Sequence, residues 1–326
     1  MCHNTSQWLT RIVKANNRTQ GVSDMSRRPT RNRDHLRNRE LSQQARDLSG
    51  DCKRPKKRKT AFRWMGSKGK LTPHLLPYFP YHVRYISVFG GSAADLIVKP
   101  RSTIEIYNDI NHIVVNFFDV LRDRCQRREL TYRLLYTPRS RFEFSRCHAI
   151  LQEPVDDPLE VARAFFYCTL YSYGGRDPSN ERASYTATAK YRWGRIADHL
   201  DEVADRFRYM LVENLSWEQL LTKYDADETF FYLDPPYLPS TRHTDGDYRH
   251  EMSEQDHIAM LTALQHLRGL VMLSGYPSAL YEEHLSRWRR LEFEMLCSIS
   301  PAKKKPKRTE VVWMNYDSAG CRIKTA

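Results

Sequence analysis

The stretch TFFYLDPPY, residues 229–237, decides the fold of this 326-residue chain. Its first five residues are aromatic, β-branched or aliphatic, a composition typical of a buried strand. Two prolines then end the strand, because neither can donate a hydrogen bond to a sheet ladder. Asp234 should therefore lie at the carboxyl end of a strand, where ligands bind in open α/β sheets.

The residues after this strand are suited to holding an amino group. The Asp234 carboxylate and the Pro235 carbonyl can both accept N–H bonds from one amine, and Tyr237 can stack on a base for about 1–3 kcal/mol. An exocyclic amino group is conjugated with its ring, so acceptors that localise its lone pair indicate methylation of that group. We select Asp234, Pro235, Pro236 and Tyr237 as candidate catalytic residues, although four such residues can also form an ordinary turn.

A second motif lies earlier, in YISVFGGSAAD, residues 85–95. It reads as a strand, a glycine turn and a helix, which lets the backbone approach a ligand closely. Residues 104–111 read as a second strand with an acid, Asp109, near its end. An acid at this distance from the glycine turn is suited to ribose hydroxyls. The pattern is not the full G-x-G-x-x-G, so it favours a nucleoside without phosphates over a dinucleotide.

A third motif, FRWMGSK, residues 62–68, precedes the glycine turn. Trp64 offers a flat face, and Lys68 offers a positive charge for a carboxylate. An exposed tryptophan in a basic segment can instead be a simple capping hydrophobe, so this motif gains meaning only beside the other two.

In this order, the three motifs resemble those of the Dam-type, alpha-class DNA adenine methyltransferases. That family has an aromatic-glycine-lysine motif, an F-G-G-S-type turn, an acidic ribose contact, a target-recognition insert and then D-P-P-Y. The stretches 250–257, 271–277 and 310–316 are also similar to the family. The resemblance covers about residues 60–317 and leaves the N-terminal tail out.

The resemblance implies transfer of a methyl group from S-adenosylmethionine to N6 of a flipped adenine in a short specific sequence of duplex DNA. Asp234, Pro235 and Tyr237 would hold the adenine, without a covalent enzyme intermediate or a metal. The residues implied at the cofactor are Trp64, Lys68, Phe89, Gly91, Asp109 and Asp234.

Three positions depart from the family pattern. Many members carry an acid and a proline where this chain has Ser87 and Val88, and a glycine is frequent where this chain has Ala93. We expect the missing acid to affect cofactor affinity rather than the identity of the reaction, because Asp109 remains available for the ribose.

Base recognition is expected between the cofactor motifs and Asp234. Basic residues there alternate with Tyr185, Tyr191 and Trp193, a mixture suited to phosphates and bases together, although such a loop can also be ordinary surface. The candidate DNA-binding residues are Arg176, Arg182, Lys190, Arg192 and Arg195. In the flanking sequence we expect helices at 161–171, 196–212 and 253–267, the last with a capping box of Ser253 and Asp256. The helix at 196–212 would bury one face, made of Ile196, Leu200, Val203, Phe207 and Leu211.

These elements predict an α/β protein with a Rossmann-like S-adenosylmethionine-dependent methyltransferase fold. Residues 61–130 and 199–320 would form the catalytic domain, and 131–198 a helical target-recognition insert. Residues 1–60 hold 16 Lys and Arg against 5 acids, or +11 of the net charge of +13. We expect this tail to be disordered and able to add phosphate contacts, or to be a solvated extension ahead of a start at Met25.

Composition excludes several other classes. Seven cysteines without a C-x-x-C pair indicate neither a zinc site nor a disulfide framework, and none follows a proline, as the nucleophile of cytosine-ring methylation does. No apolar run is long enough for a membrane span. We expect a cytoplasmic, nucleoid-associated enzyme of a bacterium or phage, with a cognate restriction endonuclease as a candidate partner.

Three alternatives stay open. A cytosine-N4 methyltransferase would use the same chemistry, though those enzymes usually carry serine in place of Asp234. An RNA adenine methyltransferase would share the motifs. A regulator that binds DNA but has lost catalysis would be consistent with Ser87, Val88 and Ala93.

Overall fold

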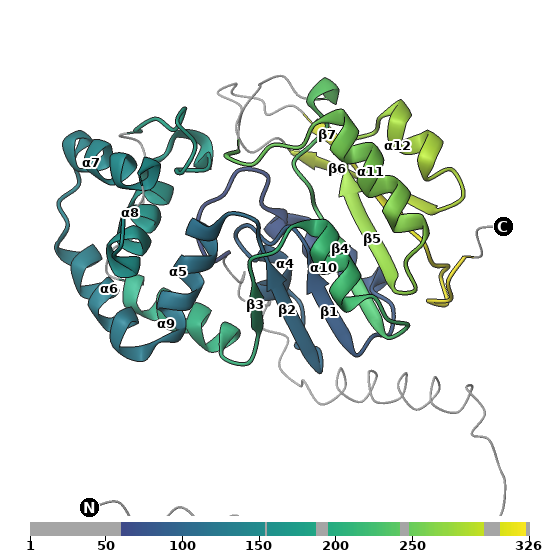
Figure 1. Ribbon diagram of the computed structural model, residues 1–326, viewed down its shortest axis with the longest axis horizontal. Helices are drawn as coiled ribbons and strands as arrows, with labels where there is room; N and C mark the ends of the chain where they lie inside the picture. Colours follow the sequence, from purple (N-terminus) through teal and green to yellow (C-terminus); the bar gives the residue numbers. More distant parts are fainter. Residues whose placement is uncertain (1–59, 154, 187–194, 242–247, 297–306, 324–326) are drawn as a thin grey trace, which may run out of the picture. The chain divides into compact units, whose positions relative to one another are not determined.

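A computed structural model describes residues 60–153, 155–186, 195–241, 248–296 and 307–323. These residues form a seven-stranded mixed sheet with helices packed on it (Figure 1). The predicted α/β class is therefore confirmed. Residues 1–59 lie outside the described part, so the boundary of the tail stays a prediction. The boundaries of the recognition insert, at 131 and 198, also stay predictions.

The sheet has the strand order β3-β2-β1-β4-β5-β7-β6. The first five strands in this order pair in parallel, whereas β7 runs antiparallel to both β5 and β6. The parallel strands therefore end at one common edge, and β7 begins at that edge. The strands are β1 (Arg84–Ser87), β2 (Ile104–Asn108), β3 (Leu211–Glu213), β4 (Thr229–Leu233), β5 (Leu270–Gly275), β6 (Arg289–Leu296) and β7 (Lys307–Met314).

Helices connect the strands and cover the sheet. The α-helices are α3 (Thr72–Leu75), α4 (Ala94–Val98), α5 (His112–Arg122), α6 (Arg124–Tyr136), α7 (Arg141–Gln152), α8 (Pro158–Tyr171), α9 (Ile196–Phe207), α10 (Trp217–Tyr224), α11 (Glu254–Gln265) and α12 (Ala279–His284). Short 3-10 turns are η1 (Lys68–Lys70), η2 (Leu76–Tyr78), η3 (Tyr173–Gly175) and η5 (Pro239–Thr241). Within the described ranges, no helix combines the length and apolar character required to cross a lipid bilayer.

Strand β4 shows how the sheet separates two cores. All five of its residues are buried, and successive side chains point to opposite faces. Phe230 and Tyr232 pack into one cluster with residues of α5, α8 and α9. Phe231 and Leu233 pack into a second cluster with residues of α10 and α11. A continuous apolar run is therefore needed here, because both faces of the strand are covered.

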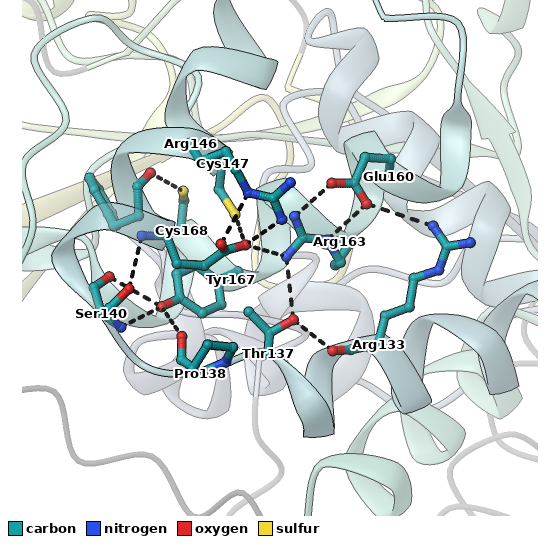
Figure 2. Close-up of polar contacts among 12 residues, drawn as sticks. Arg133, Thr137, Pro138, Ser140, Arg146, Cys147, Glu160, Arg163, Tyr167 and Cys168 are labelled. Atoms are coloured by element: carbon teal, nitrogen blue, oxygen red, sulfur yellow. Dashed lines mark hydrogen bonds and ion pairs between the residues drawn. The ribbon is translucent and has the colours of Figure 1, made fainter.

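Helices α5 to α9 form a helical layer beside the β3 edge of the sheet (Figure 1). Residues of α5, α8 and α9 share a hydrophobic core with β4. The interior of the layer contains a buried arginine, Arg163 of α8, whose side chain is 3% exposed. Arg163 donates two hydrogen bonds to Glu160, at 2.8 and 2.6 Å, and one to Glu143 of α7, at 2.9 Å. Figure 2 shows Arg163 beside Glu160, with Arg133 of α6 on the other side of Glu160. The charges link three helices of the layer.

The sequence predictions for individual elements are mostly confirmed. Residues 229–233 form a strand, and both hydrogen bonds of the capping box at Ser253 and Asp256 are present in α11. The helix predicted over 196–212 is too long, because α9 ends at Phe207 and the chain turns to form β3. Leu211, assigned to the core face of that helix, is instead 45% exposed and pairs with Ile106 of β2.

The Arg163 network predicts a large effect on stability. Arg163→Met leaves the carboxylates of Glu143 and Glu160 without their buried partner, so the free energy of unfolding should fall by about 3 kcal/mol or more. Arg122→Met removes an exposed i,i+3 pair with Asp119 and should cost less than about 1 kcal/mol. Urea denaturation followed by circular dichroism measures both. Equal losses in the two variants would contradict a structural role for the buried network.

Candidate active site

A cavity of about 480 Å³ opens at the carboxyl ends of β1, β2 and β4. Its volume lies within the range of small-molecule sites. All the residues that the sequence indicated for the cofactor and the amine line this one cavity: Trp64, Lys68, Phe89, Gly91, Asp109, Asp234, Pro235, Pro236 and Tyr237. Segments that are far apart in the chain therefore meet at the sheet edge.

An ion pair between the buried Lys68 and the half-buried Asp234 lines the cavity. Lys68 of η1 is 7% exposed, and its Nζ donates to Asp234 Oδ1 at 2.6 Å and to the Tyr237 hydroxyl at 2.7 Å. The Ser274 hydroxyl at the end of β5 donates to the same Oδ1 at 3.2 Å. Among the described residues, none donates a hydrogen bond to Asp234 Oδ2.

The pKa shifts of this pair follow from burial and mutual attraction. Burial alone would lower the pKa of Lys68, but the carboxylates of Asp234 and Glu310 more than offset this, so the pKa is raised well above its usual value. Burial raises the pKa of Asp234, and the Lys68 ammonium limits the rise. Lys68 is therefore cationic and helps to keep Asp234 an ionised acceptor.

Tyr237 is fixed both by its hydroxyl and by its ring. The hydroxyl contacts both carboxylate oxygens of Glu310, at 3.0 and 3.1 Å. The ring stacks on Tyr276, with centroids 4.1 Å apart and an interplanar angle of 26°. Tyr276 in turn accepts a hydrogen bond from Arg308 at 3.0 Å. One face of the Tyr237 ring is thus covered by the Tyr276 ring. This contact fixes the orientation of the opposite face of Tyr237.

The glycine turn forms the wall of the cavity at which the sequence predicts the cofactor, and this wall is called the cofactor wall below. Gly91 has φ of +46°, a left-handed conformation, and a Cβ at this position would lie 3.1 Å from Trp64 Nε1. A Cβ on Gly90 would collide with the Tyr107 ring at 2.2 Å. Glycines are needed here for backbone conformation at one position and for close packing at the other.

Asp109 holds the glycine turn to the end of β2. Its Oδ2 accepts from the Gly91 N–H, and its Oδ1 accepts from the Asn111 N–H, each at 2.8 Å. Burial raises the pKa of Asp109 to about 6, even though these two N–H bonds favour the charged form. A carboxylate has further lone pairs, so the bonds leave acceptor capacity for hydroxyl groups in the cavity.

The three departures from the family pattern lie at or next to this turn, and of them Val88 lines the cavity. Ser87 and Val88 are both buried, and Ala93 has φ of +54°, a left-handed conformation that is unfavourable for alanine. The helix that follows supplies an acid that sequence analysis did not select. Asp95 is 4% exposed, accepts from the Tyr85 hydroxyl at 2.9 Å, and lines the same cavity.

The candidate DNA-binding residues do not all fall in the described part of the chain. Lys190 and Arg192 lie outside it, as do Tyr191 and Trp193. Arg182 and Arg195 are exposed and Arg176 is half-buried. The segment that carries Arg176 is joined to the cofactor wall, because the Met65 N–H donates to the Gly175 carbonyl at 2.7 Å.

Sequence analysis missed several residues of the site. Ser274, Tyr276 and Glu310 contact Asp234 or Tyr237, and Asp177 lines the cavity from the helical layer. Glu310 opens the stretch 310–316, which was predicted to be similar to the family, and it stands directly before the apolar run of β7, but no role was assigned to it. Its meaning depends on β7 running antiparallel, which the sequence does not reveal.

Across the residues with a described placement, no cluster of three or more His, Cys, Asp or Glu side chains is arranged as a metal site. The features that fit a nucleoside cofactor are the glycine cradle against Trp64, the acceptor Asp109 and the cavity volume.

Comparisons with known proteins agree with this geometry. The family model of D12 class N6 adenine-specific DNA methyltransferases matches residues 64–295. The Type II methyltransferase M1.LlaDCHI of Lactococcus lactis subsp. cremoris is 24% identical over an alignment of 273 positions, which covers 78% of this chain and 94% of the relative. The matched family segment contains Trp64, Lys68, Asp109 and Asp234, and it ends before Glu310.

The left-handed alanine gives a stability prediction. Ala93→Gly removes a buried methyl group worth about 0.8 kcal/mol and adds backbone freedom to the unfolded chain, but it relieves about 1–2 kcal/mol of backbone strain. Its net effect should be within about 1 kcal/mol of zero. Ala162→Gly, in a buried helical position of α8, relieves no strain and should cost about 2 kcal/mol. Thermal unfolding of both variants tests this, and a greater loss for Ala93→Gly would contradict it.

Proposed function

Because the chain belongs to the family of D12 class N6 adenine-specific DNA methyltransferases, whose reaction is the methylation of adenine N6 in DNA, we propose that the cavity at the end of β4 is its active site. The substrate is adenine within a short specific sequence of duplex DNA, and Asp234 and Pro235 hold its amino group. The methyl donor used by a methyltransferase of this family is S-adenosylmethionine.

The arrangement of Asp234 carries the proposal. Lys68 and Ser274 both bond to Oδ1, so the carboxylate is fixed in place while Oδ2 faces no donor from the described residues. Oδ2 and the Pro235 carbonyl can accept the two N–H groups of one planar amine. Hydrogen bonds from both N–H groups to these acceptors raise the electron density on N6 and favour a pyramidal nitrogen when the acceptors lie off the plane of the amine. A pyramidal nitrogen has its lone pair localised, which increases the nucleophilicity of N6.

The neighbouring residues orient and stabilise the base. Tyr237, backed by Tyr276, offers a face on which adenine can stack. Stacking and amine contacts together offset the few kcal/mol needed to flip a base out of the duplex. Positive charge develops on N6 during transfer, and the ionised Asp234 stabilises it.

S-Adenosylmethionine supplies the methyl group when it is bound. We assign Trp64, Phe89 and Gly91 to its pocket and Asp109 to its ribose hydroxyls. Lys68 was expected to meet the cofactor carboxylate, but its ammonium contacts Asp234, Tyr237 and Glu310. We therefore give Lys68 the primary role of holding Asp234, and its contact with the cofactor stays a prediction.

Arg176, Arg182, Lys190, Arg192 and Arg195 are proposed to contact the DNA around the target base. Arginines that contact phosphates position a protein on the duplex, whereas those that reach guanine edges select the sequence. A function within a restriction–modification system is supported by the Lactococcus relative, which is a Type II methyltransferase. A partner endonuclease remains a proposal.

Methyl transfer can be tested with a cofactor tritiated in its methyl group. Wild type should transfer label to unmethylated duplex DNA, and Asp234→Ala should lower the rate by about a thousandfold, because the amine loses its charged acceptor. Label counted on filter-bound DNA measures this. Asp123→Ala removes a helix-capping carboxylate on the surface and serves as the active control.

Two results would contradict the proposal. A wild-type protein that binds duplex DNA but transfers no label would be a binding module that has lost catalysis. Faster labelling of RNA than of duplex DNA, with both present at equal concentration, would identify an RNA methyltransferase.

The raised pKa of Asp109 predicts a pH dependence of cofactor binding. The ionised form accepts from ribose hydroxyls, so affinity should be full above the pKa of about 6 and should fall as Asp109 is protonated below it. The dissociation constant should be roughly tenfold higher at pH 5 than at pH 7.5. Calorimetric titration of wild type and Asp109→Asn checks this. The variant should bind weakly at both pH values, and an equal pH response in the two proteins would contradict the role of Asp109.

A further inference from the structure

Glu310 is a buried carboxylate that the proposed mechanism has not yet used. It is the fourth of the eight residues of β7, and its neighbour Val311 pairs with Gly275 at the end of β5. Because β7 is antiparallel to β5, its first residues lie at the same sheet edge as the last residues of the parallel strands. This topology places a residue from the C-terminal part of the chain beside Asp234. Glu310 is 6% exposed.

Glu310 contacts the two residues that hold the catalytic carboxylate and the base. Its Oε1 lies 3.2 Å from Lys68 Nζ, and both of its oxygens are within hydrogen-bond distance of the Tyr237 hydroxyl. The Lys68 ammonium is therefore shared between two carboxylates, at 2.6 Å from Asp234 and 3.2 Å from Glu310.

The charges in this cluster do not cancel. Lys68 carries one positive charge, whereas Asp234 and Glu310 carry one negative charge each when ionised. Burial raises the pKa of Tyr237 well above its usual value, so its hydroxyl is neutral. Burial also raises the pKa of Glu310, an effect that Lys68 opposes and Asp234 reinforces. A second buried carboxylate beside the first is costly for the fold, which suggests that its charge serves the reaction.

We propose that Glu310 is a positioning residue for methyl transfer: it shares the Lys68 ammonium with Asp234 and so leaves Asp234 with excess negative charge toward the target amine. The inference rests on the proposed function of the cavity. A pair of Lys68 and Asp234 alone would be neutral overall, and the ammonium would oppose the positive charge that develops on N6. Glu310 neutralises the ammonium, and through Tyr237 it also holds the stacking ring in place.

The charge can be removed while the hydrogen bond is kept. Glu310→Gln retains an acceptor for the Tyr237 hydroxyl, and Glu310→Asp retains the charge on a shorter side chain. Glu292→Gln, on the neighbouring strand β6, removes an exposed carboxylate paired with Arg290 and is the matched control. The assay is single-turnover transfer of tritiated methyl groups to unmethylated duplex DNA, with cofactor and DNA affinities measured separately.

Glu310→Gln should lower the single-turnover rate about 10- to 100-fold, within the range for lost electrostatic stabilisation. Its affinities for cofactor and DNA should stay within about twofold of wild type, because the electrostatic effect belongs to the transition state. Glu310→Asp should recover at least half of this loss on a logarithmic scale, and Glu292→Gln should react at the wild-type rate.

Two results would overturn the role of Glu310 alone. In the first, Glu310→Gln reacts at the wild-type rate. In the second, Glu310→Asp is as slow as Glu310→Gln, which would make the shape of the side chain and not its charge decisive. If Glu310→Gln does not fold, Glu310→Asp decides: a rate within about tenfold of wild type supports the proposal, and a rate as low as that of Asp234→Ala overturns it. A wild-type protein without transfer activity would instead remove the proposed function, and this inference with it.

Discussion

The ion pair between Lys68 and Asp234 is the interaction on which the site depends. It joins a 3-10 turn that precedes the first strand to a loop that follows the fourth, across 166 residues of sequence. Neither group is stable alone in a buried position, because an unpaired buried charge costs several kcal/mol. Each therefore requires the other, and the requirement fixes the segment that carries Trp64 against the loop that carries Pro235 and Tyr237. The cofactor wall and the amine site are thereby held in one geometry.

The same cavity is connected to the helical layer where base recognition is expected. The Met65 N–H donates to Gly175, the Asn180 side chain donates to the Tyr248 carbonyl at 2.7 Å, and the Tyr248 hydroxyl donates to the Met65 carbonyl at 3.1 Å. These bonds connect the segment after α8 to the loop after β4, that loop to the cofactor wall, and the cofactor wall back to the segment after α8. The segment after α8, which carries the proposed DNA contact Arg176, is thus linked by hydrogen bonds to the wall of the cavity where we propose that the cofactor binds.

The parts of the site that could be predicted from sequence are those whose residues lie close together in a short stretch of the chain. Residues 229–237 give a buried strand, its end and its acceptors together, and Gly91 and Asp109 follow the same strand-and-turn logic. Glu310 could not be chosen, since its position beside Asp234 depends on one reversed strand inserted into a parallel sheet. Leu211 misled the helix prediction because its spacing from Phe207 fits a helical turn, whereas pairing with Ile106 decides its conformation. At position 93 the sequence showed the departure, and only the backbone shows that alanine keeps the left-handed turn.

The central claim is that Asp234 and Pro235 present the amino group of adenine to a methyl donor. The most direct measurement is the identity of the product. Unmethylated duplex DNA is incubated with the protein and S-adenosylmethionine, digested to nucleosides and analysed by mass spectrometry. The methylated nucleoside should be N6-methyl-2′-deoxyadenosine. N4-methyl-2′-deoxycytidine in its place would contradict it, because the acceptors at Asp234 would then serve a different base.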